Sequence, residues 1–256
     1  MTKKVLSFDV DNTLNLAKTP MKPEISELVV KLLDKYDICP ISGQKFEQFI
    51  IQVVKPLQAA GATDEQLKRL HLFVAQGTQY YKYDGTEWVL EYNYTLTDKQ
   101  VAEISEALET AAKELGYWEE DKLQSGDEII ENRLSMVAYS ALGQKASVEA
   151  KLAWDEDMSK RNKIAKRAGE LAPTYDFEVG GTTTINAFPR GMNKVFGMTK
   201  LLENLDVTMD EVLYFGDMTQ PGGNDYPVVQ MGFDTITVRD WQETANVLRG
   251  ILMIQS

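Results

Sequence analysis

Residues 5–13 read VLSFDVDNT, and this stretch decides the fold that we predict. Its apolar part, Val5–Val10, is short and ends among acidic residues, as expected of a buried strand in a parallel sheet. Asp9 and Asp11 therefore stand on a loop beyond the carboxyl end of a strand, where open α/β sheets bind their ligands. A solvated acidic turn is the alternative, because Asp-x-Asp alone is a common pattern.

Predicted strands and helices alternate in the first and last parts of the chain. In chain order, the elements predicted there are a helix at residues 23–36, a strand at 38–42, a helix at 46–57, a strand at 70–76, a helix at 193–205, strands at 212–215 and 234–238, and a helix at 243–253. The first helix places Ile25, Val29 and Leu32 on one apolar stripe. This alternation predicts an α/β fold with a parallel sheet and helices on both of its faces.

The middle of the chain has a different character. Asp84-Gly85 separates two runs rich in aromatic residues and predicts a β-hairpin. Thr97 and Gln100 form a capping box for a helix that should end near Leu115. Beyond this helix we predict one long strand at 128–142 and another at 175–188.

A charged helical stretch at 147–171 separates these two long strands. Long strands with few helices predict an α+β insertion with an antiparallel sheet. The predicted domains are a core formed by residues 1–85 and 186–256 and an inserted domain at residues 86–185.

Composition narrows the possible functions of this 256-residue chain. Its net charge of −12 argues against a nucleic-acid binder, which normally carries a basic face. One cysteine, Cys39, and one histidine, His71, exclude an internal disulfide and a multi-histidine metal site, and we expect both residues to be structural. The first apolar run is too short for a signal peptide or a membrane span, so we expect a cytoplasmic protein with no membrane partner.

A second acidic strand end lies far from the first one in the sequence. Asp217 follows the predicted strand at 212–215, and Asp225 follows a Pro-Gly-Gly turn. A glycine-rich turn without function is the alternative, but two acidic strand ends are harder to dismiss than one. Asp9, Asp217 and Asp225 can face one edge of the sheet and form a magnesium site of hard oxygen ligands.

Groups that could hold a phosphate come from two further places. Ser42, in Ile41-Ser42-Gly43-Gln44, follows the second predicted strand and can donate to a phosphate oxygen. Lys194 opens the predicted helix at 193–205, and both its ammonium and the helix N-terminus favour an anion. Each residue alone is more typical of a cap or of the surface. As members of an ordered set, they indicate a phosphate site.

The order of these motifs resembles the haloacid dehalogenase (HAD) superfamily. Over nearly its whole length the chain resembles the eukaryotic-type phosphomannomutase family, which has a type IIB cap. The stretches that carry the resemblance are FDVDNTL (8–14), YKYDG (81–85), NRLSM (132–136), GGTTTINAFPRGMNK (180–194) and FGDMTQPGGNDY (215–226). The resemblance implies a Rossmann-like HAD core with a parallel sheet and a cap inserted after the third strand.

The resemblance also implies a mechanism. Asp9 would attack phosphorus and become an aspartyl phosphate, and Asp11 would act as general acid and then as general base. Mg²⁺ would be held by the Asp9 side chain, the Asp11 main-chain carbonyl and Asp217. The other residues expected at the phosphate are Ser42 and Lys194, with Asp225 supporting them, and Thr13 and Gly43 among the groups that bind the substrate.

The inserted domain departs from the family pattern. In the family, three cap arginines grip the phosphate that is not reacting. Arg133 matches the first of them, but Gln144 and Lys151 stand at the other two positions. Charge-assisted hydrogen bonds contribute about 1.5–3 kcal/mol each, and neither residue reproduces an arginine fork. The other substrate contacts that the resemblance implies are Thr184 and Asn186 at the sugar hydroxyls and Lys18 on the loop after Asp11.

These departures bear on the reaction. A mutase must hold a bisphosphate intermediate while it reorients, whereas a phosphatase needs only to admit water. We therefore expect a Mg²⁺-dependent HAD phosphatase that acts on a phosphorylated sugar. A phosphomannomutase or another phosphohexomutase is the alternative, and a non-catalytic ligand-binding protein is a more distant one. We also expect a homodimer through the cap.

Overall fold

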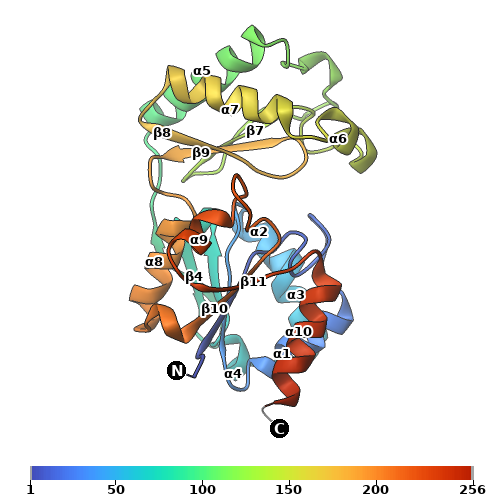
Figure 1. Cartoon of the computed structure of the whole chain (residues 1–256), viewed down its shortest axis with the longest axis vertical. Helices are drawn as coiled ribbons and strands as arrows, with labels where there is room; N and C mark the ends of the chain where they lie inside the picture. The colour runs from blue at the N-terminus through green and yellow to red at the C-terminus, as the bar shows by residue number, and fades with distance from the viewer. Residues whose placement is uncertain (1, 255–256) are drawn as a thin grey trace. The chain divides into compact units, whose positions relative to one another are not determined.

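The computed structural model describes residues 2–254, which divide into two compact units (Figure 1). One unit contains the described residues up to Asn93 and those from Asn193 onward, and the other is Tyr94–Met192. Both divisions lie a few residues later than the predicted ones at 85/86 and 185/186. The first does so because the strand Trp88–Asn93 pairs within the first unit, and the second because Thr184–Pro189 pairs within the second.

A four-stranded parallel sheet in the order β11-β10-β1-β2 forms the centre of the first unit. Its strands are β1 (Val5–Phe8), β2 (Asp37–Pro40), β10 (Val212–Gly216) and β11 (Asp234–Thr237). All four parallel strands end at the same edge of the sheet, so the loops that follow β1, β2 and β10 lie close together there. The predicted parallel sheet is confirmed.

Helices cover both faces of this sheet, as Figure 1 shows, with α1, α3 and α10 on one side and α8 and α9 on the other. The helices of this unit are α1 (Pro23–Leu32), α2 (Phe46–Phe49), the π-helix η1 (Ile50–Val54), α3 (Lys55–Ala59), α4 (Asp64–Leu67), α8 (Lys194–Leu205), the 3₁₀-helix η4 (Met209–Glu211), α9 (Tyr226–Gln230) and α10 (Trp241–Met253). The predicted helix at 46–57 is thus interrupted by a π-helical segment.

A hairpin sheet continues the first unit beyond β2. It contains β3 (His71–Val74), the 3₁₀-helix η2 (Ala75–Gly77), β4 (Gln79–Tyr83) and β5 (Trp88–Asn93), in the order β3-β4-β5. The predicted hairpin around Asp84-Gly85 is confirmed. His71 is buried and its Nδ1 lies 2.8 Å from the Tyr80 hydroxyl, which agrees with a structural histidine.

The second unit packs helices against an antiparallel sheet in the order β6-β7-β9-β8. Its elements are α5 (Asp98–Glu114), the 3₁₀-helix η3 (Glu120–Lys122), β6 (Ile130–Asn132), β7 (Val137–Ser140), α6 (Val148–Trp154), α7 (Ser159–Leu171), β8 (Tyr175–Val179) and β9 (Thr184–Pro189). The capping box of Thr97 and Gln100 begins α5 as predicted, with both reciprocal hydrogen bonds present.

Two strand predictions for this unit are wrong, and the predicted helical stretch forms two helices. The predicted strand at 128–142 is the hairpin β6–β7, whose turn places Leu134 at φ 69°. The predicted strand at 175–188 is the hairpin β8–β9, closed by a bond from the Gly180 N–H to the Thr184 carbonyl at 2.9 Å. The helical stretch at 147–171 breaks into α6 and α7 where Met158 adopts φ 60°. Each residue pattern continues across its turn, so periodicity alone does not reveal the break.

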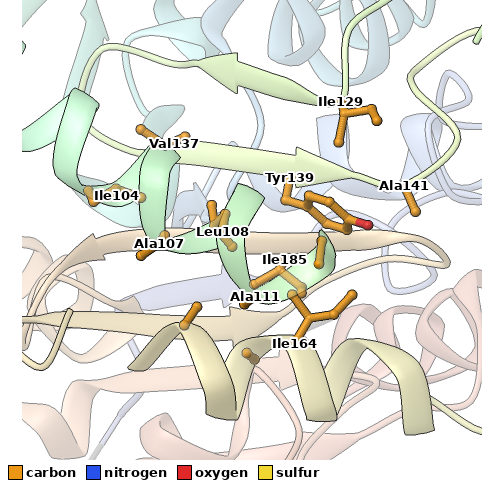
Figure 2. Packing of buried hydrophobic residues seen from close by; sticks show 14 of the residues in the cluster. Ile104, Ala107, Leu108, Ala111, Ile129, Val137, Tyr139, Ala141, Ile164 and Ile185 are labelled. Carbon is orange, nitrogen blue, oxygen red and sulfur yellow. The ribbon is translucent and has the colours of Figure 1, made fainter. Parts of the chain in front are cut away.

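Buried apolar side chains from two helices and the sheet form the core of the second unit (Figure 2). Leu108 of α5 and Ile164 of α7 lie over Tyr139 of β7 and Ile185 of β9, and all four are buried. Burying a large apolar side chain contributes about 1.5–3 kcal/mol, so this cluster is a principal source of the unit's stability.

Candidate active site

Asp9 and Asp217 lie at the carboxyl ends of the neighbouring strands β1 and β10. The Asp9 N–H donates to the Phe215 carbonyl at 2.8 Å, so the two loops leave the sheet side by side. Phe8 precedes Asp9 by one residue, and Phe215 precedes Asp217 by two. The rings of Phe8 and Phe215 stack with centroids 4.6 Å apart. This packing anchors the backbone from which both carboxylates project.

Asp225 completes a cluster of carboxylates at this edge of the sheet. One carboxylate oxygen from each of Asp9, Asp217 and Asp225 lies within 4.8 Å of the others. Asp9 and Asp225 are 4% and 0% exposed, and Asp217 is partly buried. The structure therefore brings the two acidic strand ends together.

Lys194, the first residue of α8, supplies the positive charge among these acids. Its side chain is fully buried, and its Nζ donates to Asp9 Oδ1 and to Asp225 Oδ1. A third contact joins the same Nζ to the Tyr214 hydroxyl at 3.2 Å. The helix begins here because the Asn193 side chain caps it, accepting from the Val195 N–H at 3.0 Å.

The charges of the cluster do not balance. Burial raises the pKa of Asp9 well above its usual value, the Lys194 charge opposes this, and Asp225 and Asp217 add to it. Burial and the Asp225 charge raise the pKa of Asp217 to about 6. Burial lowers the pKa of Lys194, but the charges of Asp225 and Asp9 outweigh this effect, so its pKa lies well above the usual value. The site therefore has one firmly held cation among three carboxylates.

Several groups fix the Asp225 carboxylate. Its Oδ2 accepts from the Met218 N–H at 3.0 Å, and its Oδ1 accepts from the Tyr214 hydroxyl at 2.5 Å. A Cβ atom at Gly216 would lie 2.5 Å from Asp225 Oδ2. Any side chain larger than a hydrogen at position 216 would push Asp225 away, which explains the glycine of the Phe-Gly-Asp motif.

Asp11 is held in the loop after β1. Its Oδ1 accepts from the Lys18 N–H at 2.8 Å, so the main chain of Lys18 contacts it while the Lys18 side chain is exposed. Burial raises the pKa of Asp11, against smaller opposing effects of the Lys18 N–H and of the nearby Gln44 side chain. Gln44 was missed by our sequence reasoning, although it belongs to the motif that contains Ser42. Asn12 joins this loop to the cluster, because its Nδ2 donates to Asp217 Oδ2 at 3.3 Å.

The predicted hydroxyl groups lie on the loops of the same edge. Ser42, 6% exposed, stands two residues after the end of β2. Its carbonyl accepts from the Gln76 N–H at 2.9 Å, and Gly43 follows it in this loop. Thr13 is fully buried, and its hydroxyl has no hydrogen-bond partner among the residues that the structure describes. A buried hydroxyl of this kind commonly bonds to a ligand or an ordered water.

The second unit contains the substrate-binding residues that were predicted for the cap. Arg133 lies in the turn after β6 rather than on a strand, and its Nε donates to Glu131 Oε2 at 2.7 Å. The Gln144 amide donates to Ser140 Oγ at 2.9 Å. Lys151 is 8% exposed, and its Nζ donates to the Gln144 carbonyl at 2.7 Å. The remaining two predicted residues, Thr184 and Asn186, are buried on β9.

A buried ion pair in this unit was not predicted. Arg161 Nε donates to Asp155 Oδ2 at 2.7 Å, and the two side chains are 5% and 0% exposed. The Arg161 guanidinium also donates to the carbonyls of Gly180 and Gly181, in the turn that leads to Thr184. The pair therefore fixes the start of the segment that carries the predicted sugar contacts.

Comparison with known proteins identifies the family. Residues 122–254, just over half of the chain, match the family model described as eukaryotic phosphomannomutase. The chain belongs to the eukaryotic phosphomannomutase family. A probable phosphomannomutase of Caenorhabditis elegans is 26% identical over 235 residues, which cover 89% of this chain and 86% of that protein. Phosphomannomutase 1 of Mus musculus is 27% identical over 229 residues, covering 86% and 81%.

Solved structures share the fold of this eukaryotic phosphomannomutase family member. A C-terminally truncated IMP-nucleotidase of Plasmodium falciparum matches 99% of this chain and 72% of its own, with a TM-score of 0.72 and 17% identity. A haloacid dehalogenase-like hydrolase from Bacteroides thetaiotaomicron matches 98% and 100%, with a TM-score of 0.62 and 14% identity. The predicted HAD fold, with its parallel-sheet core and antiparallel insertion, is confirmed.

Proposed function

We propose that this protein is a Mg²⁺-dependent phosphoryl-transfer enzyme of the HAD type that hydrolyses sugar phosphates through an aspartyl phosphate on Asp9. The observation that carries the proposal is the contact between the buried Lys194 ammonium and Asp9 Oδ1. A lysine in this position can stabilise the negative charge of a phosphoryl group as that group reaches the Asp9 carboxylate. Membership of the phosphomannomutase family supports a sugar phosphate as the substrate.

The residues at the edge of the sheet fit a divalent cation. Three carboxylates meet there with a single ammonium, and burial together with the neighbouring Asp225 charge raises the pKa of Asp217 to about 6. Carboxylate and carbonyl oxygens are the ligands that Mg²⁺ prefers. Asp9, Asp217 and the Asp11 carbonyl would hold the ion, which would neutralise charge on the phosphate. Asp225 is better suited to holding Lys194, because its oxygens already bond to Lys194, Tyr214 and the Met218 N–H.

The chain's own residues account for the two chemical steps. An Asp9 oxygen forms a bond to phosphorus while the bond from phosphorus to the sugar oxygen breaks. Asp11 donates a proton to the departing sugar oxygen, and its raised pKa suits a general acid. Asp11 then accepts a proton from the water that attacks the phosphorus, which returns Asp9 to a carboxylate. A carboxylate nucleophile needs no activating base, in keeping with a chain that has one histidine.

Contacts in the second unit favour hydrolysis over mutase activity. Gln144 and Lys151 replace two arginines of the family, and here Lys151 donates to the Gln144 carbonyl while Gln144 donates to Ser140. The Lys151 ammonium already donates to a carbonyl, and the Gln144 amide is neutral. Together they bind a second phosphate less well than two guanidinium groups would. Arg133 and family membership favour the second candidate, a phosphohexomutase such as a phosphomannomutase.

Turnover of hexose 1- and 6-phosphates with Mg²⁺, measured with and without a hexose bisphosphate, separates the candidates. We expect inorganic phosphate to be released without the bisphosphate. Isomerisation that depends on the bisphosphate, with little free phosphate, would assign the mutase instead. Turnover of neither kind across the panel would contradict phosphoryl transfer to sugars.

The proposal extends to location and assembly. Among the described residues, no helix combines the length and apolar character that crossing a membrane requires. We propose a cytoplasmic enzyme, which the single buried thiol, Cys39, supports because it suits a reducing compartment. A homodimer through the second unit remains part of the proposal. Val148 and Leu152 of α6, 66% and 53% exposed, are apolar residues that such a contact would cover.

A further inference from the structure

Tyr214 is the one partner of Lys194 that our account of the reaction leaves unused. It lies on β10 with 0% exposure, three residues before Asp217. Its hydroxyl oxygen accepts from Lys194 Nζ at 3.2 Å, and its hydroxyl hydrogen is donated to Asp225 Oδ1 at 2.5 Å. A hydroxyl used both as donor and as acceptor has a fixed orientation.

The hydrogen bonds of the Lys194 ammonium can be counted. An ammonium group has three hydrogens to donate. Three oxygens surround Nζ, namely Asp9 Oδ1, Asp225 Oδ1 and the Tyr214 hydroxyl. Because the side chain is fully buried, water does not replace a missing acceptor at low cost. Tyr214 therefore completes the coordination of the ammonium.

The reaction changes one of the three contacts of Lys194 and leaves the other two unchanged. In the proposed mechanism, the Asp9 carboxylate becomes an acyl phosphate and loses its charge, whereas Asp225 and Tyr214 are unchanged. With two of its hydrogens held by unchanging partners, Lys194 keeps the third directed at the oxygen of the nucleophile. Without the Tyr214 hydroxyl, the ammonium is held by Asp225 alone on that side and can rotate away.

We propose that Tyr214 is a positioning residue that, together with Asp225, directs the Lys194 ammonium toward the phosphoryl group transferred to Asp9. This inference rests on the proposed function. Tyr214 touches neither substrate nor metal in this scheme and acts only through Lys194. A purely structural tyrosine would affect stability and leave the chemical step unchanged, and this difference can be measured.

The test compares Tyr214→Phe with Tyr80→Phe. Tyr80 is a matched control because it is buried in the same unit and its hydroxyl also makes a hydrogen bond, with His71 at 2.8 Å. A lost hydrogen bond to a charged group corresponds to a rate effect of about tenfold or more. We expect Tyr214→Phe to lower kcat by about that factor with KM changed by less than about threefold, and Tyr80→Phe to leave both unchanged. Equal kcat for Tyr214→Phe and the unmodified protein would overturn the proposal.

A second measurement does not depend on activity, and its first part uses the unmodified protein alone. Proton–nitrogen NMR spectra of the unmodified protein should show a slowly exchanging Lys194 ammonium with a cross-peak to the Tyr214 ring. In Tyr214→Phe the ammonium signal should broaden or disappear through faster exchange, and in Tyr80→Phe it should persist. Absence of the cross-peak in the unmodified protein overturns the positioning role. If the unmodified protein turns over no sugar phosphate but shows the cross-peak, the proposed function fails while the contact stands.

Discussion

The Lys151 ammonium donates to the main-chain carbonyl of Gln144 at 2.7 Å, so the two residues that stand at arginine positions of the family bond to each other. Lys151 is only 8% exposed, and burial lowers its pKa. An ammonium that is partly desolvated and already donating has less capacity to attract a second phosphate. The relationship leads directly to a gain-of-function experiment.

Replacing both residues, by Gln144→Arg with Lys151→Arg, should strengthen binding of a hexose bisphosphate. Each guanidinium can form a bidentate contact with phosphate, and each such contact contributes about 1.5–3 kcal/mol, so we expect affinity to rise at least tenfold. Calorimetric titration measures this, and isomerisation assays check for mutase turnover. Lys166→Arg, at an exposed position of α7, is the control and should change neither the affinity for the bisphosphate nor the turnover. Efficient mutase turnover by the unmodified protein would contradict the reasoning.

Asp9→Asn should remove nearly all turnover while the protein stays folded, because an amide is a poor nucleophile. Asp11→Asn should be nearly as damaging but should allow phosphorylated Asp9 to accumulate, since the general acid and base is gone. Intact-protein mass spectrometry after mixing with substrate detects that adduct. Asp210→Asn, at an exposed site, serves as the control with normal rates. Full activity in folded Asp9→Asn would exclude the nucleophile.

Chelation of divalent metal should abolish turnover, and Mg²⁺ should restore it. Bound metal also stabilises the fold, by about 2.7 kcal/mol when its concentration is a hundred times Kd. Thermal unfolding should therefore shift upward with Mg²⁺ in the unmodified protein. The shift should be lost in Asp217→Asn and retained in Asp210→Asn. Turnover that survives exhaustive chelation would rule out the metal.

Arg161→Met should destabilise the protein by about 3–5 kcal/mol, because it leaves the buried Asp155 carboxylate without its cationic partner and with main-chain N–H donors alone. Arg167→Met is the matched control on the same helix, where Arg167 pairs with Glu114 at the surface and the loss should stay below about 1 kcal/mol. Denaturant unfolding of the two variants gives the comparison. Similar small losses in both would mean that the buried pair is not a principal support of the Gly180–Gly181 turn.

At low pH, the Asp127 carboxylate should stabilise the loop that contains Gln144 less. The N–H groups of Gln144 and Lys145 donate to Asp127 at 2.9 and 2.8 Å, and these bonds outweigh burial and lower the Asp127 pKa. Its stabilising effect is thus present above the unfolded value near 3.8 and is lost as pH falls through the lower folded value. The difference in unfolding free energy between the unmodified protein and Asp127→Asn should shrink on acidification. Asp121→Asn, which replaces an exposed residue, is the control: its difference in unfolding free energy from the unmodified protein should stay constant.

Much of the fold could be predicted because local patterns and tertiary structure agree. The apolar run before Asp9 forms β1, the Thr97–Gln100 box begins α5, and Asp84-Gly85 makes a hairpin turn. The predictions at 128–142 and 175–188 were wrong because Leu134 and the Gly180–Thr183 turn reverse the chain inside continuous patterns. Only the pairing of each strand with its neighbour reveals where such a run folds back.

Some features of the candidate site could likewise be predicted from the sequence, and others could not. The sequence by itself determined that Asp9 and Asp217 end parallel strands and so come to one edge of the sheet, because parallel strands share their direction. Only the tertiary structure decided that Tyr214 contacts Lys194 and that Lys151 bonds to Gln144. These contacts join side chains from separate elements, and their geometry depends on burial and on packing that no local pattern encodes.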